Sequence, residues 1–200
     1  MRLLTSACLA VLLTLGTAPA FATQEYILPT LFDVARVAPD DVLNIRQRPD
    51  ARSPVIGTLA PDATGIEITE ARGNWGRVNA GEVSGWVSMR FLDYRTDVWE
   101  WGQLPAGFSC YGTEPFWSLS VEGGDLVHAT PEGEARHRIT AILDRGVFRD
   151  PARAVVAGPI TLTATPQICS DGMSDRVMGL GAMAVMDGTE LLTGCCRIAR

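Results

Sequence analysis

The cysteines constrain the fold of this chain more than any other feature. Of five cysteines, four lie in the second half, at Cys110, Cys169, Cys195 and Cys196. An even number in an exported chain favours two disulfide bonds. Adjacent cysteines rarely bond to each other because the ring is strained, so Cys195 and Cys196 each need a distant partner. Two pairings remain open, and both predict a cross-linked C-terminal domain and an N-terminal part that folds without disulfides.

Residues 1–22 have the pattern of a secretory signal peptide. Arg2 precedes an apolar run over residues 3–15, and Ala20-Phe21-Ala22 places small residues where signal peptidase cleaves. A retained anchor is the alternative, but the run is short for a bilayer span. Cys8 lies inside the run, which does not fit a lipid-modified cysteine. We therefore expect a periplasmic or secreted protein with no membrane span after signal removal.

The charge balance narrows the classes of partner. The formal net charge is −6, and the chain contains no lysine, which we interpret as coding bias. An acidic balance argues against binding to nucleic acid or to anionic lipid. We expect no nucleic-acid partner.

The N-terminal half reads as short strands without any helical period. Runs rich in β-branched or aromatic residues are bounded by turn-forming pairs such as Pro-Asp and Gly-Glu. The alternation predicts that Leu43 and Ile45 share one strand face and that Ile66 and Ile68 do the same. The expected strands are 32–37, 42–46, 55–59, 65–70, 75–78 and 85–89. They predict a small barrel of five or six strands.

Four blocks in this half carry a family resemblance. VLNIR at 42–46, SPVIGTL at 53–59, NWGRV at 74–78 and SGWV at 84–87 follow one another over about sixty residues. In this order they resemble the bacterial SH3-like (SH3b) domain. The resemblance implies a module that binds cell-wall peptides or partner proteins, with Arg46, Trp75 and Trp86 as candidate binding residues. Gln47-Arg48-Pro49-Asp50 departs from the family, which often has a small residue and glycine after the arginine.

The same three residues have structural alternatives. A tryptophan in so small a barrel often belongs to the core. Arginines at 46, 48 and 52 can instead pair with aspartates at 40, 41 and 50 on the surface. Gly85 before Trp86 is expected to allow a close approach within the last hairpin.

We expect a division into a signal peptide at 1–22, an SH3-like domain at 30–93, a linker at 94–107 and a C-terminal β-domain at 108–200. Pro105 and Gly107 interrupt any regular pattern in the linker. Trp99 and Trp101 are large for a free tether. We expect both to pack on one domain or between the two, which would fix their relative orientation.

The C-terminal half predicts an antiparallel β-barrel or sandwich, so the whole chain is expected to be all-β. Residues 116–121 alternate between apolar and polar, and Gly123-Gly124-Asp125 and Asp187-Gly188 favour hairpin turns. Further strands are expected at 126–129, 138–143, 154–156, 160–165, 182–186 and 190–196.

The stretch CYGTEPFW, residues 110–117, is interpreted as a structural staple rather than a ligand site. Cys110 anchors one end, Glu114-Pro115 bends the chain, and Trp117 is expected to plug one end of the barrel. A buried indole needs a partner for its N–H, and Arg197 is a candidate to stack over the ring.

A second dense stretch is CSDGMSDR, residues 169–176. Asp171 and Asp175, with the two serines, could form an oxygen-rich binding loop. The spacing lacks the distal carboxylate of a calcium loop, so we expect no metal site. The alternative is an Asx-type turn in which Arg176 pairs with an acid.

The C-terminal motifs also carry a resemblance. GTEPFW, CSDGMSDR and the closing Gly194-Cys195-Cys196-Arg197 resemble a family of uncharacterised exported bacterial β-domains, over about ninety residues. Family members usually continue CSDGMSDR with Tyr-Pro, whereas this chain has Val177-Met178-Gly179.

Known catalytic patterns are missing from the sequence, and we expect neither an enzyme nor a cofactor. No histidine follows Cys169, Thr193 replaces the histidine that precedes Gly-Cys-x-Arg in L,D-transpeptidases, and disulfide-bonded thiols are not nucleophiles. His128 and His137 could share a metal ion with Glu132 or Glu134, but histidines in such turns are usually solvated.

The leading hypothesis is an exported, non-enzymatic binding protein whose SH3-like module recognises a cell-wall peptide or a protein partner. One alternative is a small-molecule carrier or enzyme inhibitor that acts through the C-terminal barrel. Another is a degenerate cell-wall enzyme. The ligand and the oligomeric state are not predicted.

Overall fold

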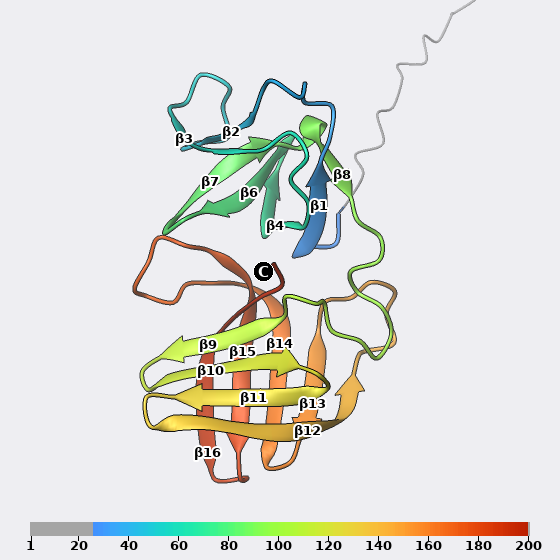
Figure 1. Ribbon diagram of the computed structural model, residues 1–200, viewed down its shortest axis with the longest axis vertical. Helices are drawn as coiled ribbons and strands as arrows, with labels where there is room; N and C mark the ends of the chain where they lie inside the picture. Colours follow the sequence, from blue (N-terminus) through green and yellow to red (C-terminus); the bar gives the residue numbers. More distant parts are fainter. Residues whose placement is uncertain (1–25, 200) are drawn as a thin grey trace, which may run out of the picture.

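The protein is all-β in the computed structural model, which describes residues 26–199 (Figure 1). Sixteen strands and one short 3₁₀ turn, η1 (Met89–Phe91), form two β-units stacked end to end. The expected signal peptide at 1–22 lies outside the described residues. Within them, no helix is long and apolar enough to span a bilayer.

The N-terminal unit contains two small antiparallel sheets. One has the order β4-β1-β8 and the other the order β3-β2-β7-β6-β5. Six of these strands match the predicted runs, whereas β5 and β8 were not predicted. The strands are β1 (Thr30–Val34), β2 (Leu43–Arg46), β3 (Val55–Leu59), β4 (Ile66–Ile68), β5 (Glu70–Arg72), β6 (Trp75–Ala80), β7 (Val83–Ser88) and β8 (Leu92–Tyr94).

Alternating side chains from both sheets build the N-terminal core. Leu43, Ile45 and Ile68 are buried and Ile66 is half-buried, as the two-residue period predicted. Gly85 confirms the expected close approach, because a Cβ there would lie 2.6 Å from Ile45 Cγ2. The buried members of this core are Phe32, Val34, Leu43, Ile45, Ile68, Val78, Val87, Met89 and Leu92.

The C-terminal unit is a closed antiparallel barrel in which eight consecutive strands pair with their neighbours and the last pairs with the first. This resolves the choice between barrel and sandwich. β9 was not predicted, and β12, β14 and β15 are longer than expected. The strands are β9 (Ser109–Thr113), β10 (Phe116–Glu122), β11 (Asp125–Thr130), β12 (Gly133–Leu143), β13 (Arg153–Ala157), β14 (Ile160–Cys169), β15 (Met178–Met186) and β16 (Glu190–Arg197).

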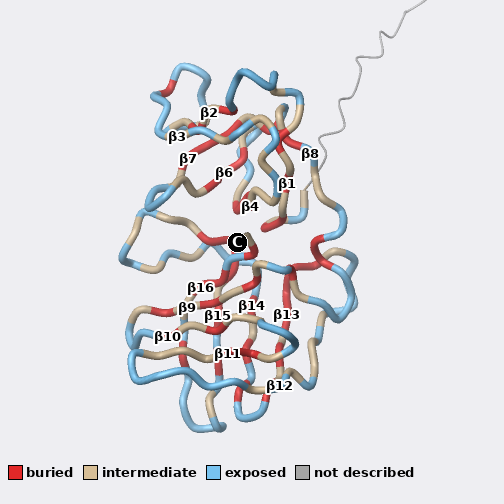
Figure 2. Tube along the Cα trace, viewed as in Figure 1, coloured by how far each residue is buried: buried red, intermediate tan, exposed pale blue. Residues whose placement is uncertain are grey.

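Side chains fill the barrel interior. Ile160, Leu162 and Ala164 alternate with less buried residues in the first half of β14, and the tube view shows buried positions recurring along the barrel strands (Figure 2). Small residues alternate with large ones, so opposing strands interdigitate. The main members of the core are Trp117, Leu119, Leu126, Val155, Ala157, Ile160, Leu162, Ala164, Leu180, Ala182, Ala184, Leu192 and Ile198.

The connection between the two units, residues 95–108, packs closely against them. Trp99 is buried, and its indole Nε1 donates a hydrogen bond to the carbonyl of Pro29 at 2.8 Å. The Arg153 guanidinium lies 5.0 Å from the Trp99 ring. Trp101 is 52% exposed, so the prediction that both tryptophans pack was right for Trp99 and wrong for Trp101. Trp99 thus contacts the N-terminal unit through Pro29 and the barrel through Arg153.

Candidate functional site

The predicted binding residues of the SH3-like unit lie on the outer face of its five-stranded sheet. Arg46 pairs with Trp86, and Trp86 in turn pairs with Arg77, across neighbouring strands. Directly opposite residues in a sheet share a face, and residues two apart on one strand do so as well. Trp75, two residues before Arg77, therefore lies on this face too. The opposite face carries the core residue Val87, so none of the three candidates belongs to that core.

A groove of about 560 Å³ runs beside this face. Arg46 and Trp75 both line it, and Trp75 is half-buried with part of its indole exposed. The remaining polar and charged lining includes Arg36, Asp41 and Arg90. The groove thus combines an accessible aromatic surface with three arginines and one aspartate.

Contacts with the following loop fix the position of Arg46. Its Nη1 donates to the Ser53 carbonyl at 2.8 Å, and the Ser53 hydroxyl accepts a hydrogen bond from the Arg48 backbone at 3.0 Å. The described residues show no ion pairs between these arginines and the nearby aspartates. Instead, Asp50 accepts a hydrogen bond from the Arg52 backbone. The guanidinium of Arg46 is therefore held at the groove without a carboxylate partner among the residues the structure covers.

Trp86 is less accessible than Trp75. It is only 6% exposed, and the guanidinium carbons of Arg72 and Arg77 lie 4.9 and 5.7 Å from its ring. Glu70 forms ion pairs with both arginines at 2.7 and 3.3 Å. These guanidinium groups stack on the Trp86 indole and cover it. Trp86 therefore has a structural role on this face of the sheet.

Asp171 shapes the CSDGMSDR loop. Its Oδ1 accepts hydrogen bonds from the backbone N–H groups of Met173 at 3.0 Å and Ser174 at 2.9 Å. Burial alone would raise the pKa of Asp171, but the hydrogen bonds from Ser174 and Met173 outweigh it, and the pKa lies below its ordinary value. The Asx-type turn predicted for this loop is confirmed.

Asp175 and the residues after it dock the loop on the β6–β7 hairpin. The Asp175 backbone donates to the Glu82 carbonyl at 2.9 Å, and Arg176 forms an ion pair with the Glu82 carboxylate. Asn79 and Val177 exchange two hydrogen bonds at 3.0 and 3.1 Å. This loop connects the two units. Asp171 and Asp175 line separate cavities, and neither lies in the groove with Arg46 and Trp75.

All four cysteines of the second half form disulfides. Cys110 bonds to Cys196 and Cys169 to Cys195, which is one of the two predicted pairings. Cys110 and Cys196 sit directly opposite each other on β9 and β16, the pair of strands that closes the barrel. These thiols are consumed as cross-links and are not nucleophiles.

Trp117 sits in a space that two glycines leave open. A Cβ on Gly112 would overlap the indole Nε1, and a Cβ on Gly194 would overlap the Tyr111 carbonyl. The Glu114-Pro115 peptide in the adjacent turn is cis. The expected structural role of GTEPFW is consistent with this packing.

The proposed partners of Trp117 were wrong. Its Nε1 is buried and has no hydrogen-bond partner among the described residues. Arg197 donates to the Ser109 hydroxyl at 3.2 Å instead of stacking on the ring.

On β11 and β12, His128 lies opposite Ala135 and His137 lies opposite Leu126, so the two histidines are diagonal neighbours on one face of the sheet. Burial lowers the pKa of His128, and His137 lowers it further. Within residues 26–199, no three histidine, cysteine, aspartate or glutamate side chains gather as a metal-binding group.

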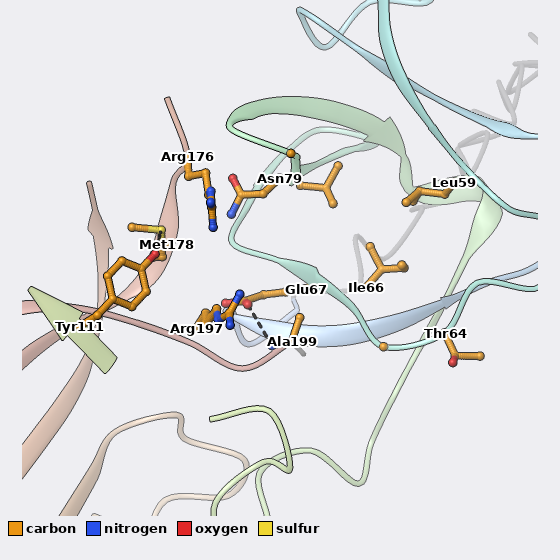
Figure 3. Close-up of a pocket in the computed structure, with 13 residues that line it drawn as sticks. Leu59, Thr64, Ile66, Glu67, Asn79, Tyr111, Arg176, Met178, Arg197 and Ala199 are labelled. Carbon is orange, nitrogen blue, oxygen red and sulfur yellow. Dashed lines mark hydrogen bonds between the residues drawn. The ribbon is translucent and has the colours of Figure 1, made fainter. Parts of the chain in front are cut away.

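A cleft between the two units was not predicted from the sequence (Figure 3). It has a volume of about 310 Å³ and receives Glu67 and Asn79 from the SH3-like unit and Tyr111, Arg176 and Arg197 from the barrel. Glu67 lies between two isoleucines on a strand, so its sequence pattern indicates an outward, solvated side chain. The only signal in the sequence was the presence of Arg176 in CSDGMSDR and of Arg197 in the closing Gly194-Cys195-Cys196-Arg197 motif.

Comparison with known proteins assigns one part of the chain. Residues 41–93 match the bacterial SH3 domain family. No curated protein and no solved structure matches the chain. The barrel is a separate β-domain without a named family, and its motif resemblance to exported β-domains stays a prediction.

Proposed function

We propose that this protein is an exported, non-enzymatic binding protein whose SH3-like domain binds an extended peptide, from the cell wall or from a protein partner, in the groove beside Arg46 and Trp75. The observation that carries the proposal is the half-exposed Trp75 indole in a groove whose lining holds three arginines and one aspartate. The match to a bacterial SH3 domain supports a binding role.

The groove chemistry favours a peptide that carries free carboxylates. Arg36 forms an ion pair with Asp93 at 2.6 Å, whereas Arg46 and Arg90 form none among the described residues and supply the positive charge of the groove, although the whole chain is acidic. Guanidinium groups bind carboxylates with paired hydrogen bonds, and an indole face accepts aliphatic side chains. Trp86 packs on the same sheet face outside the groove lining, Asp171 shapes its own loop, and the Asp175 backbone joins that loop to the SH3-like unit.

The structure offers less support for the alternative functions. A carrier needs an open interior, whereas the barrel interior is packed with side chains. A cysteine-dependent cell-wall enzyme needs a free thiol, whereas the four cysteines of the barrel are bonded.

The test is co-sedimentation of the oxidised full-length protein with purified peptidoglycan and, separately, titration with its soluble stem peptides. Trp75→Ala and Arg46→Gln are expected to reduce binding at least tenfold. Trp101→Ala is the matched control, because this tryptophan is exposed outside the groove. Equal binding by Trp75→Ala and the unsubstituted protein, with equal unfolding midpoints, would refute the groove. Binding to neither probe would refute the cell-wall ligand and leave a protein partner to be sought.

A further inference from the structure

The interdomain cleft has one polar side and one apolar side (Figure 3). Arg176, Arg197 and Tyr111 form the polar side, and all three come from the barrel unit. The SH3-like unit supplies the apolar side through Leu59, Ile66 and Val78. The cleft therefore exists only when the two units are docked as observed.

The polar side is rich in hydrogen-bond donors. Arg176 uses one Nη atom for Glu82, and its Nε is buried without an acceptor among the described residues. Arg197 donates through Nε to Ser109, and within residues 26–199 it forms no ion pair. Among residues 26–199, the Tyr111 hydroxyl has only the sulfur of Met178 as a partner, at 3.3 Å. A methionine sulfur is a weak acceptor, so this hydroxyl can donate to a better one.

Glu67 is held in the cleft by the backbone of residues 198 and 199. Its Oε2 accepts backbone hydrogen bonds from Ile198 at 3.0 Å and Ala199 at 3.1 Å, whereas Oε1 is buried without a partner among the described residues. Burial raises the pKa of Glu67, although the hydrogen bonds from Ile198 and Ala199 and the charge of Arg197 oppose the rise. Both guanidinium groups line the same cleft and can donate hydrogen bonds to an anionic ligand.

The volume and the apolar side restrict the ligand further. A cavity of about 310 Å³ is at the small end of the range for ligand pockets. Its aliphatic side chains favour a short hydrocarbon chain next to the anionic group. A planar carboxylate can accept paired hydrogen bonds from an arginine.

We propose that the cleft between the two units is a second binding site, for a small organic carboxylate whose anionic group contacts Arg176 and Arg197 and whose aliphatic chain lies against Leu59, Ile66 and Val78. This site is separate from the Trp75 groove, and its failure would leave the groove proposal unchanged.

The test uses the oxidised full-length protein labelled with ¹⁵N, titrated with sodium butyrate. Sodium acetate, sodium chloride and butylammonium chloride serve as probes at matched ionic strength. The backbone amides of Ile198 and Ala199 report on the cleft because they bind Glu67. We expect saturable chemical-shift changes of these amides with butyrate. Butylammonium chloride should cause no change beyond that seen with sodium chloride. Acetate should bind several-fold more weakly than butyrate, because it has two fewer methylene groups.

Two variants locate the site. Arg197→Gln and Arg176→Gln are expected to weaken butyrate binding at least tenfold. Arg197 is exposed, so its substitution leaves packing intact even if Arg176→Gln loosens the docked loop. Arg136→Gln is the matched control, since Arg136 pairs with Glu122 and Glu134 on the barrel surface. Shifts of equal size with chloride, unchanged affinity in Arg197→Gln, or equal binding of acetate and butyrate would each overturn the proposal.

Discussion

The two units of this protein are stabilised in different ways. The barrel is a closed ring of hydrogen-bonded strands with a packed interior and two disulfides. The SH3-like unit has two open sheets, no cysteine and a smaller core. Edge strands and partly exposed side chains remain in the open unit, and these are the features that bind extended ligands. We therefore expect most of the stability to come from the barrel, while the proposed recognition belongs to the SH3-like unit.

The units also differ in how much each depends on the other. Strand β16 closes the barrel and then continues to Ile198 and Ala199, whose backbone N–H groups bind Glu67 of the SH3-like unit (Figure 1). The docked loop adds contacts to Asn79 and Glu82. The SH3-like unit is therefore stabilised in part by contacts with the barrel, which has its own disulfides.

The largest expected effect comes from removing the Cys110–Cys196 bond. It links residues 86 positions apart and joins the strands that close the barrel. Cys110→Ser with Cys196→Ser should lower the free energy of unfolding by about 3–5 kcal/mol in urea titrations followed by near-UV circular dichroism. The matched pair Cys169→Ser with Cys195→Ser, which spans 26 positions, should cost less. If the Cys110→Ser, Cys196→Ser variant lost the same free energy of unfolding as the other pair, or less, the larger contribution expected of the bond that closes the barrel would be wrong.

Packing around Trp117 gives the next effect. Gly112→Ala should lower the free energy of unfolding of the barrel by about 2–3 kcal/mol, because its Cβ would overlap the indole and lie 2.6 Å from the Thr193 carbonyl. Gly181→Ala, in the same barrel, is the control, because its nearest neighbour is the flexible Gln167 side chain at 3.3 Å. If Gly112→Ala and Gly181→Ala unfold at the same denaturant concentration, the missing Cβ of Gly112 is not what makes room for Trp117.

The contact between the units gives the smallest effect. Glu67→Ala should cost about 1–2 kcal/mol, because two buried backbone N–H groups lose their acceptor. Amide hydrogen exchange should rise at Ile198 and Ala199 while exchange in the barrel core stays unchanged. Glu190→Ala, at an exposed position of the barrel, is the control.

A second substitution of the same residue tests the charge of Glu67. Its pKa is raised in the folded protein from a reference of 4.5, so the stability gained from the neutral acid is fully present below pH 4.5 and is lost as pH rises through the folded pKa. Glu67→Gln has no such loss. Its stability relative to the unsubstituted protein should therefore increase between pH 4 and pH 7.5, and a constant difference would contradict a buried, titrating Glu67.

Local patterns were sufficient to predict much of the fold. Alternation placed Leu43 and Ile45 in the N-terminal core, and turn pairs located the hairpins at 123–125 and 187–188. The cysteine arrangement predicted the possible disulfides because strain excludes a bond between adjacent residues. Strand β9 was missed because Ser109–Thr113 is short and contains a cysteine and a glycine, which weaken a β-pattern.

Features that depend on distant contacts were not predicted. Trp99 and Trp101 have the same local signal, yet only Trp99 finds a carbonyl acceptor at Pro29, seventy positions away. Trp86 is likewise covered by Arg72 and Arg77, which no local pattern around the tryptophan indicates. The cleft required the docking of two units, and no spacing within either unit encodes where Glu67 meets residues 198 and 199.

The pairing of β9 with β16 has a consequence for biogenesis. If the chain crosses a membrane N-terminus first, the SH3-like strands emerge and can pair while the last barrel strand is still inside the translocation channel. The barrel can close only after residue 197 has emerged, so its unpaired edges at β9 and β15 stay exposed until then. Envelope chaperones that protect such edges would therefore act on the second half of this protein.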